Sequence, residues 1–287
     1  MQIAHIILAH KNPGQLEFLI KTMSHQGGDF YIHIDKKVGT EPFEYLEQIE
    51  QVYLVKNNVV CNWGGYSIVE SIIHSIEQVK QSGIKYDFVN ILSGQCFPIK
   101  PISQIHNFLE NNKGSSFIEF DEFNDTQWWR ETQDRYKKFH LTDMKFKGKY
   151  ILQAILNTIM PKRTYLEKIF KLYGGNKSTW CIITYDCAEY FITYLKKNPK
   201  LVKYMKFTWG SDEFIVPTVL MNSPLKDTII NKSYRYIDWS DGGVSPKLLT
   251  INDYNKIINS DGMFARKFDM DIDAEILHKL HKHVCTD

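Results

Sequence analysis

The chain has 287 residues, which is long enough for one large α/β domain or two small ones with a substantial buried core. It is 43% hydrophobic and 24% charged, the composition of a globular protein, and its formal net charge of +2 disfavours nucleic-acid binding as a general property. The five cysteines include no Cys-x-x-Cys pair and no partner histidines at zinc-finger spacing, so reduced thiols and a cytoplasmic location are predicted. We expect no signal peptide, and no apolar stretch is long enough to predict a membrane-spanning helix.

The first half of the chain alternates β-branched runs with amphipathic helical patterns, which is typical of βα units around a mainly parallel sheet. The run 87–92 is apolar enough to be the central strand. In chain order, the expected strands are 3–9, 29–34, 52–55, 87–92 and 180–184, and the expected helices are 14–26, 66–82, 187–195, 215–220 and 274–283.

The segment 124–174 differs from the rest because it is dense in Lys, Arg and aromatic residues and has a less regular pattern. We interpret it as an insertion over the sheet, and three roles stay open for it: an acceptor lid, a membrane-surface contact or a subunit interface. Its basic stretch 137–149 is interpreted as an ordinary charged surface and not as a nucleic-acid site. No linker or repeat interrupts the chain, so a single domain over residues 1–287 is predicted.

Aromatic residues make up 14% of the chain. Flat aromatic faces stack well on sugar rings and on bases, but we expect most of the tryptophans in the core. The six tryptophans are Trp63, Trp128, Trp129, Trp180, Trp209 and Trp239.

A carboxylate and two cations follow the second expected strand, in the run from Asp35 to Lys37. Open α/β sheets bind their ligands just beyond the carboxyl ends of the strands. An aspartate in this position can accept a hydrogen bond from a base or from a ribose hydroxyl of a nucleotide. Capping of the following helix explains the same residue equally well.

Asp212 and Glu213 lie side by side after a turn of small residues and before the expected helix at 215–220. The helix dipole stabilises acidic side chains at a helix start, which is one explanation for both residues. The other explanation is catalysis, because a sugar hydroxyl becomes a good nucleophile only when a general base removes its proton.

Five blocks of sequence occur in the order in which one enzyme family has them, and together they span about residues 3–283. They resemble the core-2/I-branching β-1,6-N-acetylglucosaminyltransferase family, glycosyltransferase family 14, whose relatives include peptide O-xylosyltransferases and many bacterial proteins. The blocks are IHIDKK at 32–37, NILSGQCFPIK at 90–100, SDEF at 211–214, RYIDW at 235–239 and FARKFD at 264–269.

The resemblance implies a single-domain GT-A fold, an α/β, Rossmann-like architecture with a mainly parallel sheet flanked by helices. It implies an inverting transfer of a sugar, N-acetylglucosamine by expectation, from a UDP-sugar to a hydroxyl of a glycan acceptor. It also implies that no metal and no cofactor take part, because basic side chains hold the diphosphate. A bacterial, cytoplasmic enzyme of surface-polysaccharide synthesis is the expected setting. A lipid-linked acceptor and a peripheral contact with the inner face of the cytoplasmic membrane stay open.

The resemblance also assigns roles to residues of this chain. Glu213 matches the catalytic base, and Lys267 matches a lysine that binds the diphosphate. Lys247 lies in the segment where the animal enzymes have an arginine for the diphosphate, so we take it as the substitute, although a lysine lacks the guanidinium fork. The donor-side candidates are Lys267, Arg266, Lys247, Asp35, Lys37, His10 and Trp63, and the acceptor-side candidates are Trp239, Glu119, Asp212, Arg130 and Arg135.

Two further hypotheses stay open. A metal-dependent transferase would place its metal on carboxylates, and the spacing of Asp269, Asp271 and Asp273 suits one. These residues precede the last expected helix, however, where a cap or a solvated surface is the simpler interpretation. The strand 87–92 also lacks the Asp-x-Asp that metal-dependent enzymes of this fold usually carry at its end. The second hypothesis is a catalytically silent module that binds a glycan or a nucleotide.

Overall fold

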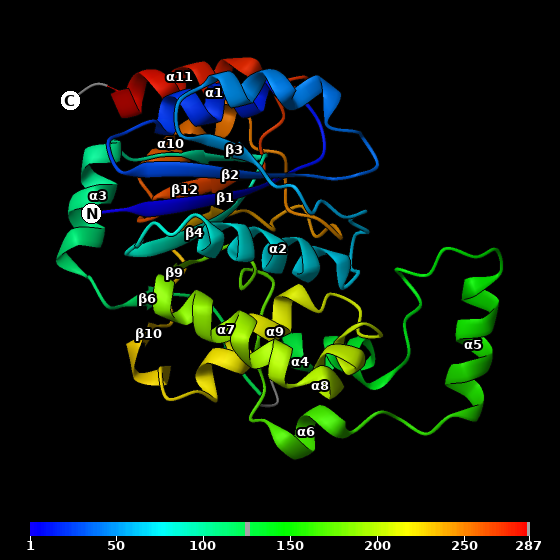
Figure 1. Ribbon diagram of the computed structural model, residues 1–287. Helices are drawn as coiled ribbons and strands as arrows, with labels where there is room; N and C mark the ends of the chain where they lie inside the picture. Colours follow the sequence, from blue (N-terminus) through cyan, green and yellow to red (C-terminus); the bar gives the residue numbers. More distant parts are fainter. Residues whose placement is uncertain (124–126, 286–287) are drawn as a thin grey trace.

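A computed structural model describes residues 1–123 and 127–285, and its centre is a seven-stranded sheet (Figure 1). The strand order is β10-β6-β9-β4-β1-β2-β3, so β4 lies in the middle, as the sequence predicted. Of these seven strands, β9 runs antiparallel to its neighbours β4 and β6, and the others are parallel. The strands are β1 (Ile3–Ala9), β2 (Gly28–Ile34), β3 (Val52–Leu54), β4 (Phe88–Ser93), β6 (Ser116–Phe117), β9 (Ile182–Thr184) and β10 (Ile229–Ile230).

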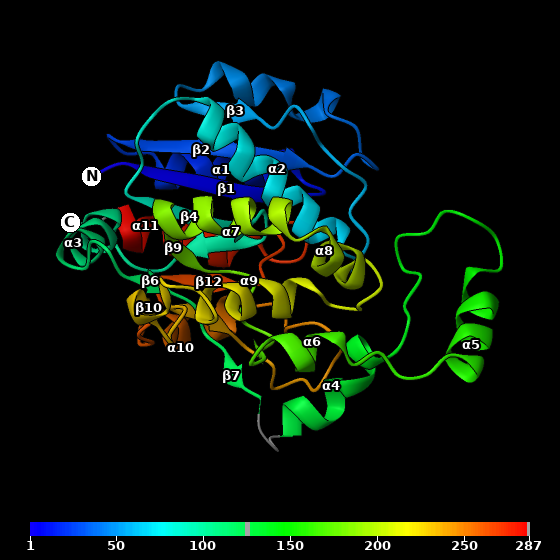
Figure 2. The same ribbon diagram turned by 60° about the horizontal axis from the view of Figure 1, so that its bottom comes forward.

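Helices cover both faces of this sheet (Figures 1 and 2), which confirms the predicted α/β architecture. Because successive side chains of a strand point to opposite faces, Ile6 packs in the apolar cluster of α2 and α7, whereas Ile7 packs in that of α1 and α11. Burial on both faces explains why the central strands, which are buried over their whole length, are mostly apolar. The four helices are α1 (Pro13–Met23), α2 (Ser67–Gln81), α7 (Tyr185–Lys197) and α11 (Ala274–Cys285).

A second, three-stranded sheet carries distant sequence blocks to the end of β4. β5 (Cys96–Pro98) pairs antiparallel with β12 (Phe264–Arg266), and β12 pairs parallel with β11 (Arg235–Ile237). The backbone N–H of Phe268 then donates to the carbonyl of Gln95 at 2.9 Å. Residues that follow β11 and β12 are thereby fixed beside the loop that follows the central strand.

The segment expected as an insertion is mostly helical, although its residues 124–126 lie outside the described residues. α4 (Gln127–Lys137) packs on α9 (Asp212–Met221), because the rings of Trp129 and Tyr136 contact the ring of Phe214. α5 (Lys149–Ile159) has no buried residue and stands away from the body of the molecule in both views (Figures 1 and 2). The expectation that this segment lies over the sheet is therefore wrong: α4 covers α9, and α5 projects outward.

Other elements agree with the sequence apart from their ends. The first helix ends at Met23 and not at residue 26, because Ser24 has an extended backbone and the chain turns at Gly27, whose φ is 87°, toward β2. No described helix is long and apolar enough to cross a membrane. The remaining elements are η1 (Glu41–Gln48), α3 (Ile102–Asn111), β7 (Asp121–Glu122), α6 (Tyr165–Ile169), β8 (Tyr173–Gly174), α8 (Pro199–Met205), η2 (Lys226–Thr228), η3 (Ile251–Asp253) and α10 (Tyr254–Ile258).

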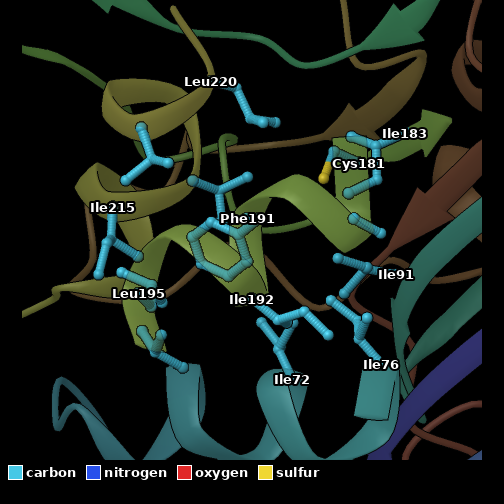
Figure 3. Close-up of a cluster of buried hydrophobic side chains, with 14 of the residues drawn as sticks. Ile72, Ile76, Ile91, Cys181, Ile183, Phe191, Ile192, Leu195, Ile215 and Leu220 are labelled. Atoms are coloured by element: carbon cyan, nitrogen blue, oxygen red, sulfur yellow. The ribbon is translucent and has the colours of Figure 1, made fainter. Parts of the chain in front are cut away.

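Phe191 of α7 lies at the centre of the larger apolar cluster, between the isoleucines of α2 and the side chains of α9 (Figure 3). It is fully buried, so truncation removes apolar contacts and leaves a cavity. We expect Phe191→Ala to lower the free energy of unfolding by about 3–5 kcal/mol, and Phe191→Leu to lower it less. Urea denaturation measures both values, and a loss below about 1 kcal/mol for Phe191→Ala would contradict this packing.

Candidate active site

The carboxyl ends of β1, β2 and β4 open into a cleft with a volume of about 660 Å³. His10 follows β1, Asp35 and Lys37 follow β2, and Gln95 follows β4. The opposite wall consists of α4, the start of α9, the end of β12 and the loop 239–246. The cleft therefore lies where open α/β sheets bind their ligands, and all five sequence blocks contribute to it.

Five of the six tryptophans line this cleft, so the expectation that most of them are core residues is wrong. Only Trp129, among the six, is fully buried in the core. The others lie in loops or near the ends of elements, where hydrophobic periodicity does not report burial. Aromatic walls of this kind suit the apolar faces of sugar rings. The five are Trp63, Trp128, Trp180, Trp209 and Trp239.

Asp35 is buried beside the cleft and holds two loops together. Its Oδ1 accepts hydrogen bonds from the backbone N–H groups of Lys37 at 3.0 Å and Cys61 at 3.2 Å. The ammonium of Lys37 lies 3.8 Å from Oδ2 and donates to the carbonyl of Cys61. The helix-cap explanation for Asp35 is therefore wrong, because this carboxylate stabilises a turn at the cleft and not a helix start.

Glu213 lies in the first turn of α9, and its side chain lines the cleft. Its Oε2 accepts a hydrogen bond from Nη1 of Arg135 at 2.7 Å, and no described residue donates to Oε1. Arg135 is itself held over the ring of Trp209, 4.5 Å from the ring centroid. Burial and the neighbouring Asp212 raise the pKa of Glu213 to about 7, and Arg135 and Arg266 oppose this rise. Glu213 can therefore accept and release a proton near neutral pH.

Asp212 and Arg266 belong to the same buried group of charges. Burial raises the pKa of Asp212, whose Oδ2 accepts a hydrogen bond from the Thr179 hydroxyl at 2.9 Å. The guanidinium of Arg266 lies 4.6 Å from the ring centroid of Trp180, and its Nε is buried with no hydrogen-bond partner among the described residues. An unsatisfied buried donor is costly, so a ligand that brings an acceptor to Arg266 would be stabilised there.

Lys267 adds a second cation to this wall of the cleft. Burial lowers the pKa of Lys267, and the nearby charges of Arg266 and Lys11 lower it further. His10 lines the same cleft, and burial and the charge of Lys11 lower its pKa while the charge of Asp35 raises it. Neighbouring cations that repel one another create a positive potential, which attracts an anionic ligand.

Ten of the thirteen candidate residues line the cleft, and three do not. The ammonium of Lys247 donates to Asp253 at 2.7 Å, and Lys177 donates to Glu119 at 2.6 Å. Arg130 is exposed on α4 and is not part of the cleft wall. The structure therefore does not support Lys247 as the diphosphate ligand or Glu119 and Arg130 as acceptor ligands. The ten are Glu213, Asp212, Arg135, Trp239, Trp63, His10, Asp35, Lys37, Arg266 and Lys267.

Three aspartates that suggested a metal site make separate contacts. Asp269 pairs with Lys11, and Asp271 accepts a hydrogen bond from Asn12 at 3.0 Å. Asp273 accepts a backbone N–H from the first turn of α11 at 3.1 Å, which is the cap that the sequence favoured. Within residues 1–123 and 127–285, no group of three or more His, Cys, Asp or Glu side chains is placed to hold a metal ion.

The contacts that position Glu213 were not predicted from the sequence. Gly64 has a φ of 72°, and a Cβ at this residue would lie 2.4 Å from Nε1 of Trp209. Gly210 donates its N–H to the carbonyl of Gly64 at 2.8 Å, so the two turns meet at the cleft. The short distance in sequence between Trp209 and Glu213 could have indicated that Trp209 lies near the cleft. The hydrogen bond between Arg135 and Glu213 left no signal in the sequence, because the two residues are far apart in the chain.

The chain matches the family model described as Core-2/I-Branching enzyme over residues 3–258. It is 24% identical over 306 residues to Xylosyltransferase 2 of Canis lupus familiaris, in an alignment that covers 99% of this chain and 34% of that protein. It is 23% identical over 304 residues to Beta-glucuronosyltransferase GlcAT14B of Arabidopsis thaliana, which covers 98% of this chain and 67% of that protein. The chain thus spans about a third of the length of the xylosyltransferase.

Two solved structures show low similarity to the chain. One is the apo form of mouse xyloside xylosyltransferase 1, with a TM-score of 0.40 and 9% sequence identity. The comparison covers 92% of this chain and 97% of that chain. Residues 1–349 of S. aureus TarS give a TM-score of 0.38 with 11% identity, and coverage of 80% and 57%. The family match itself extends from β1 to α10 and includes four of the five sequence blocks. The chain therefore belongs to the Core-2/I-Branching enzyme family.

Proposed function

We propose that the chain is a glycosyltransferase that moves a sugar from a UDP-sugar to a hydroxyl of a glycan acceptor, with inversion and without a metal ion. The central observation is Glu213, a carboxyl group with a pKa of about 7 in a tryptophan-lined cleft that also holds fixed cations. A base with this pKa is matched to proton transfer at neutral pH. Family relatives that are named as sugar transferases support the same class of reaction.

The donor site follows from the charges at the carboxyl ends of the strands. Asp35 can accept a hydrogen bond from the uridine, since its carboxylate lies beside the cleft at the end of β2. Arg266 and Lys267 are the groups that meet the diphosphate, in the place of a divalent ion. The guanidinium of Arg266, which lines the cleft and forms no ion pair with a described residue, can donate to a phosphate oxygen.

The reaction itself uses the free oxygen of Glu213. Arg135 holds Oε2, so Oε1 is the atom that takes the proton from the acceptor hydroxyl. The hydroxyl oxygen forms a bond to the anomeric carbon from the face opposite the diphosphate, and the bond from that carbon to the diphosphate breaks. The electron pair leaves on UDP, where the charges of Arg266 and Lys267 stabilise it. The proton stays on Glu213 until it passes to solvent.

The acceptor sugar is proposed to stack on Trp239, which lines the same cleft. N-acetylglucosamine is the donor sugar that we expect, and the names of the relatives make xylose and glucuronic acid the alternatives to test. We place the reaction in the synthesis of a bacterial surface polysaccharide in the cytoplasm, on the strength of the sequence resemblance.

Glu213→Gln tests the proposed base. This change keeps the shape and the hydrogen bonding of the side chain but removes its ability to take a proton. We expect turnover with a UDP-sugar to fall by about 10² to 10⁴, while UDP binds with unchanged affinity. Initial rates and calorimetric UDP titration, both in the presence of EDTA, measure the two quantities.

Lys267→Ala is the matched control for this experiment. Its charge meets the diphosphate in the ground state as well as in the transition state, so we expect weaker UDP binding together with slower transfer. Full turnover by Glu213→Gln would disprove the assigned base. Turnover that requires added Mn²⁺ would disprove the metal-free mechanism.

Arg135 is expected to set the pH dependence of the reaction. The base must be deprotonated, so turnover of the unaltered protein falls as the pH drops below about 7. Arg135 lowers the pKa of Glu213, and Arg135→Gln therefore raises it and moves the acidic limb of the pH profile upward by about one pH unit or more. Arg135→Lys keeps the charge and should move the limb less. An unmoved limb in Arg135→Gln would show that this limb does not report Glu213.

A further inference from the structure

The helix α5 is amphipathic in the reverse sense to a surface helix of a globular protein. Its polar stripe, Lys149, Gln153 and Asn157, faces the rest of the chain and bonds the backbone of residues 139–142. The hydrogen bonds are 2.8 Å long from Leu141 N–H to Gln153 and 2.7 Å from Phe139 N–H to Asn157. The polar side chains thus hold the helix in place, and its apolar side is left to the solvent.

The outward side of α5 is a continuous apolar stripe. Ile151, Ile155 and Ile159 follow one another at helical spacing and are exposed by 70%, 51% and 70%. Leu152 and Met160 extend the stripe, and two exposed aromatic side chains lie beside it. Apolar surface gathered in this way marks an interaction site, whereas single exposed apolar residues do not. The aromatic side chains are Phe146 and Tyr150.

The charges around the stripe have one sign. No aspartate or glutamate occurs in residues 144–166 of the sequence. Lys145, Lys147 and Lys162 are exposed, and none of them forms an ion pair with a described residue. A partner for this surface must therefore be both apolar and anionic.

We infer that α5 with its flanking lysines, residues 144–162, lies in the plane of an anionic lipid bilayer, with its isoleucines in the acyl-chain boundary. An apolar stripe, interfacial aromatic side chains and a surplus of lysine are the features of helices that bind membrane surfaces. A second copy of this chain fits less well, because a two-fold contact through the stripe would bring the lysines of both copies together. This inference does not depend on the proposed transfer reaction.

The helix is placed to fix the cleft relative to the membrane. α5 stands off the body on the side toward which the carboxyl ends of β1 and β2 point, in both views (Figures 1 and 2). Asp143, in the loop that leads to α5, accepts hydrogen bonds from Asn62 at 2.9 Å and from the Ser67 N–H at 3.0 Å. Asn62 lines the cleft. A membrane-bound α5 would therefore hold the mouth of the cleft near lipid headgroups.

Vesicle co-sedimentation of the full chain tests this inference. The probe is a pair of vesicle preparations, phosphatidylcholine alone and phosphatidylcholine with phosphatidylglycerol. We expect binding to the anionic vesicles that weakens at high salt, and little binding to the neutral ones. The triple variant Lys145→Gln, Lys147→Gln, Lys162→Gln should bind anionic vesicles on the order of 100-fold more weakly, since each lysine near the surface contributes about five-fold.

The apolar stripe is tested separately with Ile151→Gln, Ile155→Gln, Ile159→Gln. These side chains make no core contacts, so the variant should keep its thermal midpoint and lose vesicle binding by about 10-fold or more. The matched control for the lysine variant replaces three exposed lysines elsewhere by Gln, and it should bind vesicles as the unaltered chain does. These lysines are Lys197, Lys203 and Lys226. Equal binding by the isoleucine variant would overturn the inference. A dimer that this variant abolishes, with no vesicle binding by the unaltered chain, would overturn it too and assign the stripe to a second copy.

Discussion

The ion pair between Glu213 and Arg135 joins the segments that form the cleft. Glu213 lies in the first turn of α9, whereas Arg135 lies in α4 and also accepts the Trp209 N–H through its carbonyl at 2.9 Å. The next residue, Gly210, bonds the turn at Gly64 on the opposite wall. The position of Glu213 therefore depends on α4, which belongs to the segment interpreted from the sequence as an insertion over the sheet.

The pKa of Glu213 is raised because its neighbours stabilise the charged form only in part. A carboxylate that accepts several hydrogen bonds beside cations has a low pKa and is a weak base, while an exposed one has its ordinary pKa. Here burial and the charge of Asp212 raise the pKa of Glu213, and two arginines keep the rise moderate. Buried charges cost stability, so this group is better explained by function than by folding. The guanidinium of Arg266, which forms no ion pair with a described residue, lines the same cleft and can meet an anion there.

Patterns that repeat along the chain were predictable from sequence, and single side-chain contacts were not. The strand at 3–9 and the helix at 66–82 agree with the structure, apart from the ends of the helix, because burial on a regular element leaves a periodic trace. The cleft tryptophans had no such trace, since a loop residue can face a core or a cleft with the same neighbours in sequence. Lys247 illustrates the other limit: the family resemblance placed it where relatives have a diphosphate-binding arginine, but in the structure it pairs with Asp253.

The configuration of the product tests the central claim most directly. A UDP-sugar with an α-linked donor would be incubated with the chain, a glycan acceptor and EDTA, and the new anomeric proton observed by NMR. Direct attack by a hydroxyl activated by Glu213 predicts a β-linked product without any divalent ion. An α-linked product, or transfer only after Mn²⁺ is added, would contradict this account of the cleft.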